Sequence, residues 1–152
     1  MLSTLLLAFL HHGAAFVVFA VLAVEMVLMK GELTLASARS LLRMDAVYGV
    51  AAMLLLVVGF LRVFMTEKGA AYYFHSVPFI IKISLFALVG LMSIYPTRLF
   101  LSWRPALRNQ QVPALDPAQG RTVCRLIHAE LALLLLIMLC AAAMARGVGY
   151  FG

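Results

Sequence analysis

Charged residues are scarce in this chain. Only 12% of its 152 residues are Asp, Glu, Lys or Arg, whereas soluble domains contain about 25%. Apolar residues make up 65%, and the mean hydropathy is +1.06. This composition excludes an ordinary soluble domain, and we expect an integral membrane protein in contact with the lipid bilayer.

Cysteine is also scarce. Cys124 and Cys140 fall on one expected helix, where a separation of sixteen residues corresponds to a rise of ~24 Å. They therefore cannot form a disulfide within one chain. The sequence contains neither CxxC nor CxxCH, which argues against zinc, iron–sulfur and covalently attached haem.

The first apolar run lacks the features of a signal peptide. It has no basic start and no small-residue cleavage site, and it continues to Glu25 and Lys30. We expect it to be retained as a helix.

Four apolar runs are long enough to cross a bilayer, which takes ~20 residues. They cover about 2–29, 44–65, 72–95 and 126–145. The remaining ~60 residues are too few for a second typical domain. We therefore predict an all-α fold, a single domain over 1–152 built as an integral membrane four-helix bundle.

The basic residues indicate the orientation of this bundle. Because they flank the apolar runs, they favour membrane topology over nucleic-acid binding despite a pI of 9.8. One side carries Lys30, Arg39, Arg43, Arg98, Arg104, Arg108, Arg121 and Arg125; the other carries Arg62, Lys68 and Arg146. The larger group predicts a multi-pass protein of the bacterial inner membrane, with both termini on the periplasmic side.

The loops between the runs offer further signals. Residues 31–43 could form a short surface helix that starts at Thr34 or Ser37. Residues 97–122 are expected to form a loop, with a membrane-surface segment over 99–107 that places Trp103 at the headgroups. Tyr72 and Tyr73 follow the short turn 66–69 as an interfacial anchor.

Lys82 lies within the otherwise uncharged run 72–95. A lysine near the middle of a span costs ~2.5–3.5 kcal/mol, so it needs either a route to the interface or a partner inside the bundle. Depth along the helices divides the polar residues into two layers. The outer layer contains His11, His12, Arg62, His75 and Lys82, and the inner layer contains Glu25, Arg43, Asp45, His128 and Glu130.

The spacing on the first helix distinguishes the adjacent histidines. His11, Val18 and Glu25 are seven residues apart and return to nearly the same helix face. Intramembrane acids almost always face the bundle interior, so His11 is expected to face it as well. His12 points ~100° away, toward a neighbouring helix or another subunit.

In the inner layer, we expect Glu25, Arg43 and Asp45 to form structural ion pairs that join the first two helices. His128 and Glu130 follow Arg125 and have a similar structural interpretation.

Several strings resemble a bacterial family of small four-helix membrane proteins of unassigned function, and the resemblance spans nearly the whole chain. They are Phe9-Leu10-His11-His12, Glu25, Arg43-Met44-Asp45-Ala46-Val47-Tyr48-Gly49, Gly59-Phe60-Leu61-Arg62, Phe79-Ile80-Ile81-Lys82 and Ser93-Ile94-Tyr95-Pro96.

The chain is more distantly similar to HemJ-type protoporphyrinogen oxidases and to the membrane domains of CopD-like copper proteins. HemJ-type proteins bind haem b and have a histidine early in helix one and a lysine in helix three, where His11 and Lys82 fall here. Their His-x-Lys string is absent, since His75 precedes Lys82 by seven residues. The resemblance implies haem binding more strongly than the particular oxidase activity.

The leading hypothesis is a haem b redox protein, and one form of it is an oxidoreductase. His11 would ligate the iron, His12 or His75 would supply a second metal ligand, and Arg62 with Lys82 would pair with the propionates. Tyr73, with Tyr72, would close the pocket. In an oxidase, Lys82 would be the catalytic residue that moves protons or anchors a porphyrin or quinone-like substrate.

Two alternatives remain open. Intramembrane ionisable groups also line routes for protons, ions or metals, and four helices would then have to form a homo-oligomer. A non-catalytic assembly subunit would use the same charges only to hold its helices together.

Overall fold

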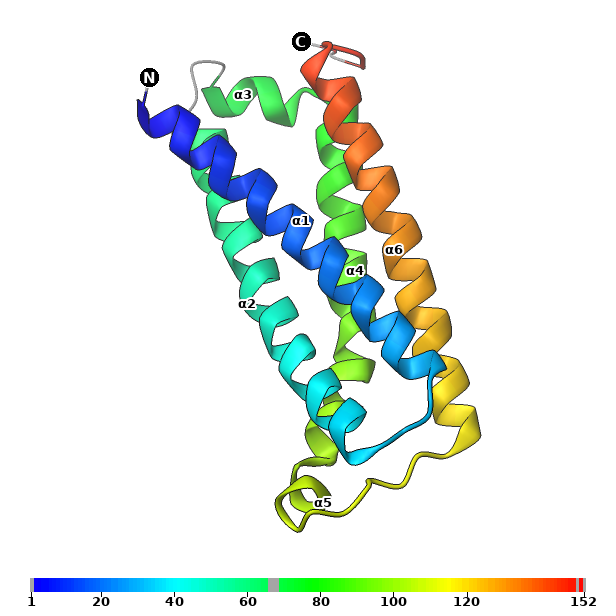
Figure 1. Ribbon diagram of the computed structural model, residues 1–152. Helices are drawn as coiled ribbons and strands as arrows, with labels where there is room; N and C mark the ends of the chain where they lie inside the picture. Colours follow the sequence, from blue (N-terminus) through cyan, green and yellow to red (C-terminus); the bar gives the residue numbers. More distant parts are fainter. Residues whose placement is uncertain (1, 66–68, 150, 152) are drawn as a thin grey trace.

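Four long helices and two short ones form the protein in a computed structural model, which describes residues 2–65, 69–149 and 151 (Figure 1). The long helices are α1 (Leu2–Lys30), α2 (Leu35–Met65), α4 (Val77–Ser102) and α6 (Pro117–Ala145). The short ones are α3 (Gly69–Phe74) and α5 (Arg104–Arg108). The described residues contain no strand, so the predicted all-α fold is confirmed.

The four long helices pack into a bundle, in which α1 slants from its start beside α2 toward α6 at the other end (Figure 1). α1 packs most extensively on α2, α4 packs on α6, and α1 also contacts α6. The start of α1, the end of α6 and α3 lie at one end, and α5 lies at the other. We call these the α3 end and the α5 end.

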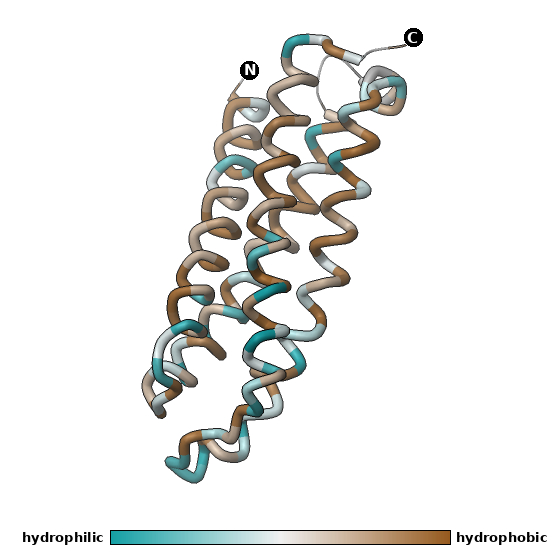
Figure 2. The backbone as a smooth tube through the Cα atoms, turned by 90° about the vertical axis from the view of Figure 1, so that its right-hand side faces the viewer, coloured by the Kyte–Doolittle hydropathy of each residue, from teal (hydrophilic) through white to brown (hydrophobic). Residues whose placement is uncertain are grey.

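The surface of the bundle suits a membrane. Four segments are long and apolar enough to span one, with α4 and α5 counted together as Val77–Arg108. Many large apolar side chains on them face outward, among them Phe9, Phe16, Val50 and Leu139. Figure 2 shows hydrophobic colour along the long helices and hydrophilic positions gathered toward the α5 end. The prediction of four transmembrane helices is thus confirmed.

α2 begins well before the predicted apolar run. The hydroxyl of Thr34 accepts a hydrogen bond from Ser37 N at 3.1 Å, while Thr34 N donates to Ser37 Oγ at 2.8 Å. These reciprocal bonds satisfy backbone donors at the helix start. The surface helix expected within 31–43 is therefore the first part of α2 itself.

α4 begins at Val77, after the predicted start at 72, and continues past the predicted end at 95. It passes through Pro96, which is buried, and ends at Ser102. A proline removes one helical hydrogen bond and crowds the carbonyl four residues before it, but membrane helices tolerate it where neighbouring helices and local adjustments satisfy the freed backbone groups. Trp103 follows as a buried residue, 3% exposed, with its ring 5.2 Å from that of Phe100. The prediction that Trp103 lies at the headgroups is therefore wrong, because the turn between α4 and α5 directs it into the core.

α6 starts at Pro117, nine residues before the predicted 126. Asp116 caps it by accepting a hydrogen bond from Ala118 N at 3.2 Å, and proline suits the first helical position. Beyond α6, Gly149 O accepts from Val77 N at 3.0 Å, so the end of the chain lies against the α3–α4 junction. The turn residues 66–68 and the side chain of Tyr72, which belong to the predicted interfacial anchor, lie outside the described part of the chain.

Candidate functional site

A cavity of about 530 Å³ opens at the α3 end of the bundle. Such a volume falls within the ~300–1,000 Å³ typical of small-molecule sites. α1, α2, α3, α4 and α6 all contribute to its lining, which includes His11, His12, Gly59, Arg62, Tyr73 and Lys82. We call it the histidine cavity. It brings together five of the six residues that the sequence placed in a cofactor site.

His11 reaches the cavity from the inward face of α1. Val18 and Glu25, on the same seven-residue spacing, are 1% and 2% exposed, which confirms the predicted face. Nδ1 of His11 is buried near the backbone of Leu55 without a hydrogen bond of ordinary geometry. A β-carbon at Gly59 would lie only 3.2 Å from His11 Cε1, so the missing side chain makes room for the imidazole.

The other two histidines have different environments. His12 lines the cavity at its exposed edge, and its Nδ1 donates to the Ala8 carbonyl at 2.7 Å. Its ring stands edge-on to that of His11, 6.0 Å away. His75 does not line the cavity: its Nδ1 donates to Ala71 O at 2.8 Å and its ring faces Phe151 at 5.6 Å.

Two cations enter the cavity from different helices. Arg62 comes from α2 and Lys82 from α4, and each lies close enough to His11 for their charges to interact. Lys82 Nζ also lies 5.2 Å from the centre of the Phe79 ring, a favourable cation–π distance. No acidic side chain is found among the described residues that line the cavity. The cavity is therefore positively charged.

The remaining walls are mostly apolar. They are formed by residues such as Leu55, Phe79, Phe86, Ile137 and Met144. A ligand that suits both parts of the lining is an apolar molecule with anionic groups, because its body would cover apolar walls while its charge meets Arg62 and Lys82.

A second polar group lies deeper in the bundle, and we call it the carboxyl cluster. It comprises Glu25 of α1, Asp45 of α2 and Glu130 of α6, which are 2%, 8% and 1% exposed. Glu25 is close enough to both other acids to feel their charges. Oε1 of Glu25 and Oε1 of Glu130 are buried without a hydrogen-bond partner in the part of the chain that the structure describes.

Hydroxyl groups surround the carboxyl cluster. Thr97 Oγ1 donates to Asp45 Oδ1 at 2.7 Å. Tyr48 OH and Ser93 Oγ also lie 2.7 Å apart, and Ser93 in turn donates to Val89 O. These bonds link α2 to α4 inside the apolar bundle.

The structure does not join Arg43 to the acids that were expected to pair with it. Arg43 is exposed, whereas Glu25 and Asp45 are buried. The two acids interact with each other and with Glu130 rather than with a cation. His128 is exposed and donates to Cys124 O at 3.0 Å, whereas Glu130 is buried, so the two residues lie on different faces of α6.

Among the described residues, no three His, Cys, Asp or Glu side chains gather where they could hold a metal ion. His11, His12 and His75 therefore do not form a three-ligand site. The sequence pointed to Gly59 as a place of close helix contact but assigned neither Gly59 nor Phe79 to the site, because that assignment depends on how close α2 and α4 approach their neighbours. Sequence reasoning also missed the Tyr48–Ser93 bond, because its partners are 45 residues apart.

Comparisons with curated proteins and with solved structures find no match to the chain. A family model does match it over residues 3–149, nearly its whole length. The chain therefore belongs to the family described as "Predicted membrane protein (DUF2214)".

Proposed function

We propose that this membrane protein binds haem b in the histidine cavity and acts as a redox protein. The observation that carries the proposal is the shared site of one inward imidazole, two cations and apolar walls. Haem b has matching chemistry: an iron that takes imidazole, an apolar macrocycle and two carboxylates.

His11 is the residue that suits the iron. A ligating histidine usually has one ring nitrogen against a backbone carbonyl or carboxylate and the other on the metal. Nδ1 of His11 is buried beside the Leu55 backbone, which leaves Nε2 for a ligand. His12 is the second candidate ligand, since it lines the same cavity. His75 is less suited, because it does not line the cavity.

Arg62 and Lys82 would pair with the propionates. Arginine can donate two parallel hydrogen bonds to a carboxylate, and lysine offers a point charge. The apolar walls would keep water from the bound group, which strengthens these charge interactions. When bound, haem b supplies a one-electron iron couple.

The resemblance to HemJ-type oxidases supports a finer version, in which the substrate is a porphyrinogen. Lys82 would then be the catalytic residue, and its Nζ would hold a substrate carboxylate or carry a proton. Tyr73 lines the same cavity and would shield it.

The test is an absorbance spectrum of purified protein, from 350 to 700 nm, with and without dithionite. The proposal expects a Soret band that shifts on reduction, and its loss or displacement in His11→Ala. His128→Ala is the matched control, because His128 is exposed on α6 outside the cavity. A wild-type protein that remains colourless after expression with ample haem, and after haem titration, contradicts the proposal.

The carboxyl cluster favours a second candidate, transport of protons or cations. Buried carboxyl groups without a basic partner are costly, and in membranes such groups often mark ion or proton routes. Proteoliposomes with a pH-sensitive dye test this idea. A proton flux that Glu25→Gln and Glu130→Gln abolish would support it, and wild-type flux equal to that of empty liposomes would contradict it.

A further inference from the structure

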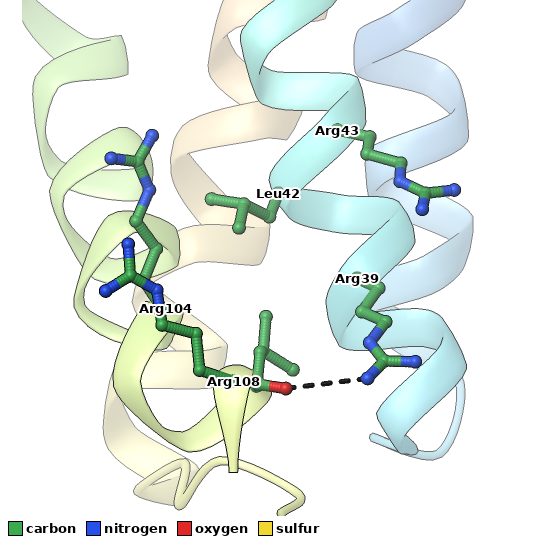
Figure 3. Close-up of a pocket in the computed structure, with 6 residues that line it drawn as sticks. Arg39, Leu42, Arg43, Arg104 and Arg108 are labelled. Atoms are coloured by element: carbon green, nitrogen blue, oxygen red, sulfur yellow. Dashed lines mark hydrogen bonds between the residues drawn. The ribbon is translucent and has the colours of Figure 1, made fainter. Parts of the chain in front are cut away.

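A second hollow, of about 330 Å³, lies at the α5 end of the bundle. Its lining consists of Arg39, Leu42, Arg43, Arg104, Leu107 and Arg108. In Figure 3, Arg39 and Arg43 project from α2, whereas Arg104 and Arg108 come from α5. We call it the arginine pocket. It joins segments about sixty residues apart in the sequence.

The pocket concentrates four positive charges. No acidic side chain belongs to its described lining. Within the described part of the chain, Arg39 is the one arginine of the pocket with protein acceptors: its Nη2 donates to Gln110 Oε1 at 2.7 Å and to Leu107 O at 3.5 Å, the second bond being drawn in Figure 3. These bonds hold α5 against α2, while the exposed guanidiniums of Arg43, Arg104 and Arg108 remain available to an anion.

The surroundings are those of a membrane boundary. Leu42 and Leu107 form the apolar part of the lining. α2 continues from the pocket directly into its apolar segment, and Leu41 beside it is fully buried in the core. A bound group would thus meet arginines on one side and hydrocarbon on the other.

We propose that the arginine pocket binds the phosphate of an anionic phospholipid headgroup. Guanidinium groups match phosphate oxygens in pairs, and basic pockets between membrane helices recognise anionic headgroups. A soluble phosphate offers the same oxygens, but it has no apolar chain to contact Leu42 and the adjacent helix surface. The site is separate from the histidine cavity, so the proposal stands whether or not haem binds.

Native mass spectrometry of the purified full-length protein in neutral detergent tests this proposal. Short-chain phosphatidylglycerol is titrated against phosphatidylcholine, with inorganic phosphate as the soluble competitor. Wild-type protein is expected to prefer phosphatidylglycerol. Arg104→Gln with Arg108→Gln should weaken that binding by roughly 25-fold, since each arginine near a headgroup contributes about fivefold.

Arg121→Gln with Arg125→Gln is the matched control. It removes the same charge from exposed positions of α6 that do not line the pocket, and should change binding by less than about twofold. Arg43→Gln is a milder variant that replaces the double variant if the latter does not fold. It is expected to weaken phosphatidylglycerol binding about fivefold. Equal losses in both double variants, or no headgroup preference, would overturn the proposal. Displacement of the lipid by low-millimolar phosphate would overturn the choice of a lipid.

Discussion

The contact between His11 and Gly59 controls how the histidine cavity is built. The two residues belong to different helices, and the imidazole occupies the space that a side chain would take. Glycine lowers helix stability by up to ~1 kcal/mol relative to alanine. Gly59 lies where the imidazole of His11 packs between α1 and α2, and a larger residue there would crowd the ring.

Gly59→Ala tests this contact. A new methyl 3.2 Å from Cε1 must push the ring by a few tenths of an ångström, so we expect haem binding to weaken by roughly tenfold. Thermal stability should change little, since helix propensity offsets the crowding. Gly49→Ala is the control on the same helix, where nothing lies within 4 Å. Titration of haem into both variants measures the difference, and identical affinities would contradict the prediction.

Thr97→Val tests the hydrogen bond to Asp45. The variant has nearly the same shape but leaves a buried carboxyl oxygen without its donor, which should cost ~1–3 kcal/mol. We expect Tm to fall by several degrees, as measured by circular dichroism with both proteins in the same detergent. Thr122→Val removes a hydroxyl that bonds only to Ala118 O at an exposed position, and should have little effect. An unchanged Tm for Thr97→Val would show that Asp45 does not depend on this bond.

At the scale of elements, the apolar runs predicted the four long helices but not their ends. Hydropathy reports where lipid surrounds a helix, whereas the ends depend on local bonds such as the Asp116 cap. Pro96 suggested an end within α4, yet bundle contacts carry the helix past it. Trp103 was misplaced for a related reason, because only the packing of α5 turns it inward.

The candidate site was predictable to a similar extent. The seven-residue spacing of His11, Val18 and Glu25 predicted that all three lie on the inward face, since this prediction needs only helix geometry. The partners of Glu25 and the existence of the arginine pocket could not be predicted, because both depend on which helices contact one another. Arg43 lies only two residues from Asp45, yet on a helix this turns it toward the surface.

The end of the chain provides a prediction about an element. Gly149 has φ +73°, and a β-carbon there would lie 3.0 Å from Pro78 Cδ. Gly149→Ala should therefore loosen the tail from the α3–α4 junction, which we expect to see as faster trypsin cleavage after Arg146. Gly147→Ala shares the positive φ (+72°), but its new β-carbon would meet none of the described residues within 4 Å. Its backbone strain of ~1–2 kcal/mol should accelerate cleavage less. Equal rates in both variants would contradict a role for the Pro78 contact.

For the whole molecule, the distribution of basic residues predicts that the α5 end is cytoplasmic and that the α3 end is periplasmic. Alkaline phosphatase fused after residue 152 should then be active, whereas the enzyme inserted after Gln111 should be inactive. Green fluorescent protein at the same two positions should give the opposite pattern. Fluorescence from the C-terminal fusion, together with active phosphatase in the 109–116 loop, would show that the orientation is the opposite of the predicted one.

The pairing of helices has a consequence for how the protein is assembled. α1 with α2 and α4 with α6 form two hairpins, each held by its own extensive contact, while α1 with α6 and α2 with α4 make smaller contacts between the hairpins. The histidine cavity is the seam between them, with His11 and Gly59 on one hairpin and Lys82 and Met144 on the other. We expect each hairpin to be able to enter the membrane before the two hairpins meet. A ligand bound there would contact both hairpins. At a free ligand concentration of a hundred times its Kd, it would stabilise their association by about 2.7 kcal/mol.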